Sequence, residues 1–214
     1  DIKEGYFFGF HDVTPFSHDE TKVLACKYSF DLRMPKAGEG VEVGYLDFKN
    51  GKMGDFHQLA TIYAWNWHKG CRLQWLNEKE VIFNNAIDGK IICTIVNVET
   101  KETRNLPHPI DTAYVSEKES IATTFSYERL QLCMPGYGYP YSDESYLNEK
   151  APKETGLFLM DLNSGERKLI VPVSVLSKSM VKIMWINTIT MLHIPSFQRM
   201  GAIYHSFIVG WKKG

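Results

Sequence analysis

The sequence predicts an all-β chain that forms a β-propeller of four-stranded antiparallel blades. Two observations carry this prediction. Short segments rich in β-branched and aromatic residues follow one another with almost no helical periodicity, and pairs of hairpins recur with similar turn chemistry. The 214 residues, 44% of them hydrophobic and 13% aromatic, suffice to bury one substantial core or two small ones, as in an ordinary globular chain.

The expected strands form a repeating unit. A polar turn lies inside one hairpin, and an apolar strand then ends in Asp or Asn before a second polar turn. Two such hairpins make a four-stranded meander. Repetition of this meander roughly every 40 to 60 residues is typical of a propeller. A two-sheet sandwich is the alternative, but it gives no reason for the hairpin pairs to recur with the same turns. The strand segments are 21–30, 41–48, 79–85, 90–98, 120–127 and 156–162.

The spacing of the repeat sets the expected blades. Asp47 and Asn97 end equivalent strands 50 residues apart, whereas Asn97 and Asp161 are 64 residues apart. The surplus lies in an insert at residues 133–154, which is a long loop by composition. We expect one incomplete propeller domain over residues 1–214, with blades at about 9–60, 70–107 and 112–172 and part of a fourth at about 180–214.

The chain beyond residue 186 departs from the repeat. No Asp or Asn with Gly opens a hairpin there, and large apolar residues appear without clean alternation. A fragment, a truncated gene product and an altered reading frame would each explain this. Closed propellers have about four to eight blades, so we expect open sheet edges here and, through them, self-association.

Three stretches carry a family resemblance: FFGFHDVTPFSHDETKVLA, NVETKETRNLP and MDLNSGERKLI. They resemble blades of the TolB-like propellers, a group that includes the oligogalacturonate lyases, and the resemblance covers about residues 5–172. It implies the propeller architecture more strongly than an activity, because such hairpins occur in many propeller families. The metal-binding histidines of the family's lyases have no counterpart that we can place on this chain. GFHD, AWNWHKG and PGYGYP resemble marks of a narrower subgroup, for which the resemblance supplies no reaction.

The segments that enter the blades predict a site at one mouth of the central channel. In a propeller the innermost strand of each blade lines the channel, and its entry segment crosses the mouth. Residues 9–16 enter the first blade, 65–72 the second and 108–115 the third. The side chains expected to converge there are His11, Asp12, Trp65, Asn66, Trp67, His68 and Arg72.

This group of side chains suits an acidic saccharide. Indole rings cover the apolar face of a pyranose, while amide, carboxylate and guanidinium groups bind its polar groups. Alternatively, Trp65, Trp67 and Trp75 wedge between adjacent blades, and Arg72 pairs with a carboxylate. The tyrosines of the insert form either a subsite wall or a surface loop that packs on its own blade. The expected ligand-binding residues are Asp12, Trp65, Asn66, Trp67, His68, Gln74, Tyr137 and Tyr139.

The sequence leaves open whether the chain is an enzyme. A polysaccharide lyase working by β-elimination needs a cation beside the uronate carboxylate and a base for the adjacent proton. Arg72 or Arg129, the latter expected at the end of an inward strand, would be the cation, and His11 the base. His11 alternatively holds the blade entry by a hydrogen bond. The second functional hypothesis is a non-catalytic propeller that serves as a protein-interaction platform, with the tryptophan segment as its recognition surface.

Charge and composition limit the expected partners. Lys and Arg number 24 against 25 Asp and Glu, and no basic run is present, so neither nucleic acid nor a membrane is an expected partner. We expect an oligosaccharide or a small polar ligand. No cofactor is indicated, and a divalent metal would require His11, Asp12 and His68 to converge.

The four cysteines are expected to be free thiols. Cys26, Cys71, Cys93 and Cys133 lie far apart and form no CxxC pair, so neither a thiolate zinc site nor a disulfide framework is indicated. Free thiols favour a reducing compartment, and no signal peptide or membrane-spanning run is visible, so we expect a cytoplasmic location. Because the chain begins at Asp1 without a methionine, prior removal of a leader is the alternative.

Overall fold

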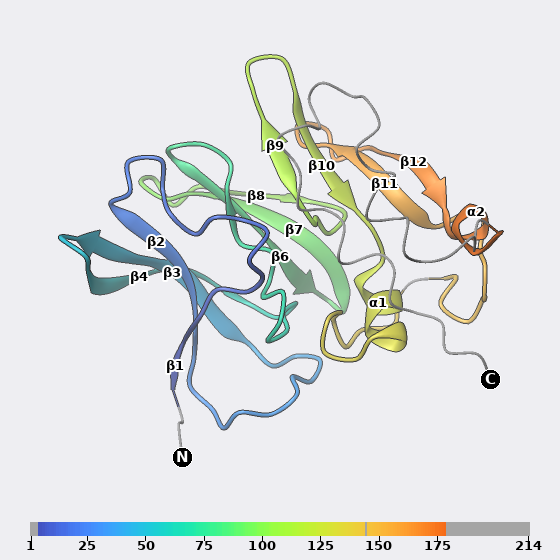
Figure 1. Cartoon of the computed structure of the whole chain (residues 1–214), viewed down its shortest axis with the longest axis horizontal. Helices are drawn as coiled ribbons and strands as arrows, with labels where there is room; N and C mark the ends of the chain where they lie inside the picture. The colour runs from blue at the N-terminus through green and yellow to red at the C-terminus, as the bar shows by residue number, and fades with distance from the viewer. Residues whose placement is uncertain (1–3, 144, 179–214) are drawn as a thin grey trace.

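The computed structural model describes residues 4–143 and 145–178, and its strands form three four-stranded antiparallel sheets (Figure 1). Strand order in each sheet follows the chain, so each sheet is a meander of two successive hairpins. We call these sheets blades 1 to 3. The prediction of an all-β chain with four-stranded antiparallel blades is confirmed. The partial fourth blade expected at about 180–214 lies outside the described residues.

Each blade is built from consecutive strands. Blade 1 consists of β1 (Gly5–Phe7), β2 (Lys22–Tyr28), β3 (Val41–Lys49) and β4 (Lys52–Ile62). Blade 2 consists of β5 (Gln74–Trp75), β6 (Glu80–Ile87), β7 (Lys90–Asn97) and β8 (Thr103–Leu106). Blade 3 consists of β9 (Ala113–Val115), β10 (Ser120–Thr124), β11 (Gly156–Asp161) and β12 (Arg167–Pro172). Two short helices, α1 (Tyr127–Cys133) and α2 (Val173–Lys178), follow β10 and β12.

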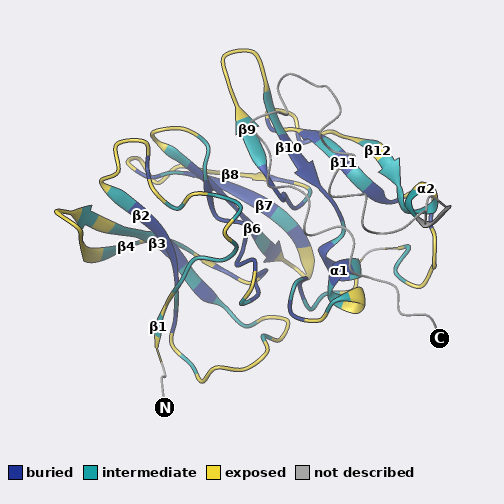
Figure 2. Ribbon diagram, viewed as in Figure 1, coloured by how far each residue is buried: buried dark blue, intermediate teal, exposed yellow. Residues whose placement is uncertain are grey.

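Blade 2 buries apolar side chains on both of its faces. Successive residues of a strand point to opposite faces, and in β6 Val81 and Phe83 pack with blade 1 while Ile82 packs with blade 3. The register pairs Val81 with Val96 and Ile82 with Ile95, so β7 continues both cores. Figure 2 shows this burial along β6 and β7. Two-sided burial explains why this part of β6 reads as an unbroken apolar run.

The connections at the two ends of the blades differ in length. At one end the β3–β4, β5–β6, β7–β8, β9–β10 and β11–β12 turns span two to five residues each. Strands alternate in direction, so the remaining connections after β2 lie at the opposite end. Two of these are short, the β6–β7 turn (88–89) and the β8–β9 connection (107–112). The other three are long: β2–β3 (29–40), β4–β5 (63–73) and β10–β11 (125–155). In Figure 1 the 29–40 loop and α1 lie on the lower side and the β9–β10 hairpin on the upper side. Long connections on a rigid scaffold are where binding residues concentrate.

The inner edge of blade 1 is interrupted. β1 ends at Phe7, and the chain returns to pair with β2 only at Phe16. Residues 8–15 therefore leave the sheet and approach blade 2. Gly9 has a φ of +135°, and a Cβ placed there would lie 2.7 Å from the backbone oxygen of Lys69. Glycine is needed at this position because both its conformation and the close approach exclude a side chain.

We predict that Phe83→Ala lowers the free energy of unfolding by about 3 to 5 kcal/mol, because it empties the core between blades 1 and 2. Ile87→Ala, in the same strand but 44% exposed, is the matched control and should cost less than about 1 kcal/mol. Urea unfolding of both variants measures the difference. Equal losses would contradict the two-sided packing of β6.

Candidate functional site

A chain of buried ion pairs joins the inner ends of the three blades. Arg72 donates from Nη1 and Nη2 to the two carboxylate oxygens of Asp12, at 2.9 Å each. Its Nε donates to the backbone oxygen of Asp111 at 2.7 Å and lies 3.2 Å from Oδ1 of the same residue. Lys69 Nζ donates to that Oδ1 at 2.7 Å. The four side chains are at most 4% exposed, so this is an interior network.

The electrostatics of the network keep its carboxylate ionised. Burial alone would raise the pKa of Asp111, but the charges of Arg72 and Lys69 outweigh burial and lower it. Burial lowers the pKa of Lys69, and the charge of Asp111 opposes this shift. Tyr127 donates its hydroxyl to Asp111 Oδ1 at 2.8 Å, whereas Asp111 Oδ2 has no hydrogen-bond partner in the part of the chain that the structure describes. Two cations and two anions thus balance within one interior cluster.

A tight turn presents Lys69 and Arg72 to this network. Oδ1 of Asn66 accepts hydrogen bonds from the backbone N–H groups of His68 and Lys69, and Gly70 closes the turn onto the Asn66 backbone. Gly70 and Arg72 both adopt positive φ, at 59° and 57°. An asparagine that caps a turn and a glycine in the left-handed region are local features of the sequence. The positive φ of Arg72 is not evident from the local sequence. This backbone conformation is strained, and the ion pairs of the side chain offset the strain.

The indole of Trp65 lies in the core between blades 1 and 2, and the half-buried indole of Trp67 packs against that core. Their rings meet edge to face at 5.0 Å, and both pack against Phe7 and Phe30. Trp65 is 1% exposed. Trp65 Nε1 donates to the backbone oxygen of Glu39 and Trp67 Nε1 to that of Arg33, so both anchor the 29–40 loop. Trp65 and Trp67 therefore pack as the alternative to sugar binding expected, as wedges in the blade framework. Trp75 also links two blades, because its Nε1 donates to the backbone oxygen of Pro15.

Asn66 and Gln74 are structural links in the interior. Asn66 Nδ2 donates to the backbone oxygens of Tyr137 and Gly138, which ties the entry of blade 2 to the insert of blade 3. Gln74 Nε2 donates to the backbone oxygens of Arg72 and Asp111, and its Oε1 accepts from Ala113 N–H. Both side chains are buried, at 0% and 4% exposure of the residue. Their hydrogen bonds join blade 2 to blade 3.

The tyrosines of the insert pack on the blades. Tyr139 is fully buried, stacks on Tyr127 at 4.3 Å and accepts a hydrogen bond from Asn84 Nδ2. Tyr137 stacks on the ring of His68, 4.3 Å away and parallel within 3°. The hydroxyl of Tyr141 donates to the backbone oxygen of Tyr63 and accepts from Gly38 N–H. The insert is therefore held down at three points.

Arg129 lies in helix α1, so its expected place at the end of an inward strand is wrong. Ser126 Oγ accepts from the backbone N–H of Arg129 at 3.0 Å and caps the helix, with Glu128 in the first turn. A serine at the N-cap and an acidic residue in the first turn both stabilise the start of a helix, which explains why α1 begins here. The guanidinium donates to three backbone oxygens within residues 146–150, at 2.5 to 3.1 Å. It holds the insert.

His11 is exposed and its ring lies 4.3 Å from that of Phe10. Its neighbour Asp12 points away to Arg72. Among the described residues, no group of three or more His, Cys, Asp or Glu side chains is arranged to hold a metal. Of the expected convergence the structure brings together Asp12 and Arg72 but not His11 and His68 with them.

Three long segments together form what we call the long-loop face, made of residues 29–40, 63–70 and 131–141. Met34 and His68 lie side by side over Gly136, where an added Cβ would be 3.4 and 3.5 Å from them. The hydroxyl of Tyr141, in the third segment, bonds to Gly38 in the first segment and to Tyr63 in the second. Exposed on this face are Leu32 at 58%, Met34 at 49%, Tyr63 at 39% and Leu132 at 63%.

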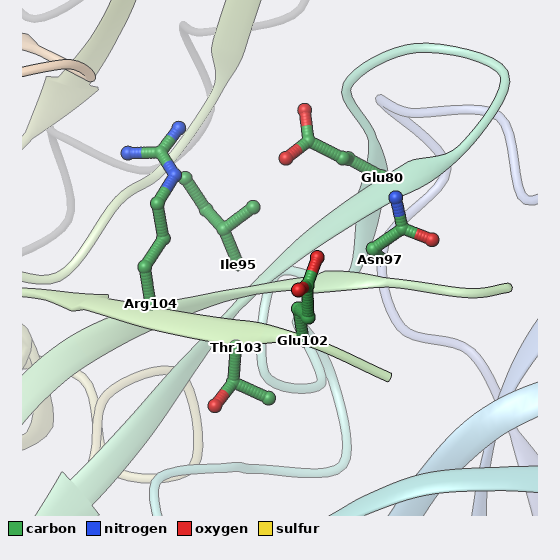
Figure 3. Close-up of a pocket in the computed structure, with 6 residues that line it drawn as sticks. All are labelled: Glu80, Ile95, Asn97, Glu102, Thr103 and Arg104. Atoms are coloured by element: carbon green, nitrogen blue, oxygen red, sulfur yellow. The ribbon is translucent and has the colours of Figure 1, made fainter. Parts of the chain in front are cut away.

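A polar groove lies elsewhere, on blade 2 (Figure 3). It is lined by Glu80, Ile95, Asn97, Glu102, Thr103 and Arg104. Glu80 already accepts a hydrogen bond from Asn77, and Arg104 donates to the backbone oxygen of Leu162 in blade 3. Of the lining residues, Arg104 thus links the groove to blade 3.

Comparison with known proteins assigns no family. No family model and no curated protein matches the chain. Solved structures found similar include TolB from Acinetobacter baumannii (12% identity, TM-score 0.41, 77% of this chain and 32% of that one) and the AtxE2 isopeptidase in its apo form (10%, 0.44, 83% and 31%). A third is a Synechocystis apocarotenoid oxygenase mutant (12%, 0.33, 74% and 37%). The chain spans about a third of the length of each. In the described part of the chain, no helix has the length and apolar character of a membrane span.

Arg72→Met should be strongly destabilising, by about 3 to 5 kcal/mol, because it leaves the carboxylates of Asp12 and Asp111 buried with too little positive charge. The matched control is Arg33→Met, which breaks the exposed ion pair of Arg33 with Glu39 and should change stability little. Urea unfolding at pH 7 measures both. Similar midpoints for the two variants would refute the structural role of Arg72.

The pH dependence of stability should reveal His108, which lies in the β8–β9 connection. Burial, with a smaller effect of Arg167, lowers the pKa of His108 from 6.5 to about 4. Between these values the unfolded chain binds a proton that the folded chain does not, so stability falls as the pH drops from about 6.5 to about 4. His108→Gln should flatten this part of the curve in urea unfolding at pH 7, 5.5 and 4.5. Parallel curves for the two proteins would contradict the shift.

Proposed function

We propose that this chain is a non-catalytic module that binds a protein partner through the long-loop face. The observation that carries the proposal is that three long connections meet on one face and are bonded to one another, and that each of them exposes at least one large apolar side chain. Loops on a rigid scaffold commonly supply binding surfaces.

The exposed residue types favour a protein as the partner. Leu32, Met34 and Leu132 are each about half exposed or more, and Tyr63 and Arg33 lie in the same segments. Met, Tyr and Arg are enriched in protein interfaces, where an apolar centre is surrounded by a polar rim.

Catalysis and saccharide binding have less support. The cations that a lyase would use are committed to the framework: Arg72 to two carboxylates and Arg129 to backbone oxygens. Trp65, whose indole would have covered a sugar ring, is buried among aromatic side chains. The ring of Tyr137 stacks on His68.

Photo-crosslinking tests the proposal. A photoreactive phenylalanine derivative replaces Leu32 in one variant and Met53 in another. Met53 is equally exposed, at 54%, but lies in β4 outside the long-loop face. We expect position 32 to give a discrete protein adduct from extracts of the native cells, identified by peptide sequencing, and position 53 to give none.

The identified partner then allows a titration with purified protein. Met34→Asp should weaken binding at least about tenfold, as expected when a desolvated apolar contact receives a charge. Its melting temperature should stay within about 2 °C of that of the parent chain, because the side chain is exposed. Met53→Asp is the control and should bind as the parent does. Equal crosslinking at both positions, or binding of an acidic oligosaccharide that Met34→Asp leaves intact, would overturn the proposal.

A further inference from the structure

Cys26 and Cys71 face each other in the core between blades 1 and 2. Their Sγ atoms are 3.8 Å apart although the residues are 45 positions apart in the chain. Both residues are 0% exposed. Cys26 lies in β2, and Cys71 lies in the turn that leads into β5. The other two cysteines differ: Cys93 is buried within β7, and Cys133 is exposed at the end of α1.

We propose that Cys26 and Cys71 form a disulfide when the chain folds in the presence of a low-molecular-weight disulfide such as oxidised glutathione. The bond staples β2 of blade 1 to the turn that carries Arg72. The two sulfurs need to approach by about 1.8 Å to reach the disulfide bond length of about 2.05 Å. Both segments already belong to one core, so the two sulfurs are neighbours before the bond forms.

The redox step balances with the named oxidant. The thiolate of one cysteine attacks oxidised glutathione, forms a mixed disulfide and releases one glutathione thiolate. The thiolate of the second cysteine attacks the protein sulfur of that mixed disulfide and releases the second glutathione thiolate. Two protein thiols are oxidised, one glutathione disulfide is reduced, and the two protons pass to the released thiolates.

Burial sets the time at which this chemistry occurs. The hydrogen bond between the two thiols and their burial raise the pKa of Cys26 well above its usual range, so the folded protein offers little thiolate there. Neither sulfur is in contact with solvent. Exchange therefore occurs before blades 1 and 2 close on each other. Once formed, the bond is shielded from soluble reductants, and the redox state records the environment in which the chain folded.

Refolding of the wild-type chain tests the proposal. Denatured, reduced protein is refolded with oxidised and reduced glutathione or with dithiothreitol, and remaining thiols are alkylated under denaturing conditions. Mass spectrometry should find four alkylated cysteines after dithiothreitol but two, Cys93 and Cys133, after glutathione. A non-reducing digest should contain a Cys26–Cys71 linked peptide. Four alkylated cysteines in both samples, or a linkage through Cys93 or Cys133, would overturn the proposal.

Timing and stability give independent measurements. Oxidised glutathione added to the folded, reduced protein should form the bond at least about tenfold more slowly than during refolding. The bonded protein should melt on the order of 5 to 10 °C higher than the reduced one, because the bond closes a long loop. Cys133→Ser should keep this difference and Cys71→Ser should abolish it. Equal melting temperatures of the oxidised and reduced wild-type protein would refute a stabilising Cys26–Cys71 disulfide, whether or not Cys71→Ser folds.

Discussion

The arrangement of the three blades depends on the ion pairs and hydrogen bonds of the Arg72 guanidinium. One planar group contacts Asp12 from blade 1 and both Asp111 and Thr112 at the start of blade 3, while its own backbone leads into blade 2. Apolar packing between blades tolerates small sliding, because dispersion contacts are numerous and weak. A buried charge does not, since any displacement leaves an ion without its partner. The ion pairs therefore fix the relative positions of blades that the apolar cores hold together.

Several residues that the sequence suggested for ligand binding or catalysis instead make hydrogen bonds or ion pairs between blades. Asn66, Gln74 and Arg72 each bond to backbone or side chains of another blade. Trp65 and Trp67 anchor the 29–40 loop by their indole N–H groups. Polar groups in a core must be hydrogen-bonded, so a joint needs donors and acceptors in specific places, as an active site does. A binding residue differs from a structural link between blades in being exposed, and exposure is known only from the folded chain. The long-loop face differs from the interior network because its apolar side chains are exposed.

The fold could be predicted because its signals are local. Turn residues, alternation and the apolar run in β6 are written in neighbouring positions of the sequence. The sequence also placed Trp65 and Trp67 in one segment, and both join one aromatic cluster. Which side became the interior depends on Phe7 and Phe30, which belong to other segments. The partners of Arg129 could not be predicted either, because they are backbone oxygens of an irregular insert.

Blade 2 is incomplete without both neighbours, and this affects how the protein is made. During synthesis the chain leaves the ribosome from its N-terminus, so blade 1 is available when Val81 and Phe83 emerge. Ile82 and Ile95, on the opposite face, pack with Ala122 and Met160, which are translated later. For that interval the nascent chain displays an apolar sheet face to water or to a chaperone. The order of translation thus leaves the junction between blades 2 and 3 open to misassembly until blade 3 has been made.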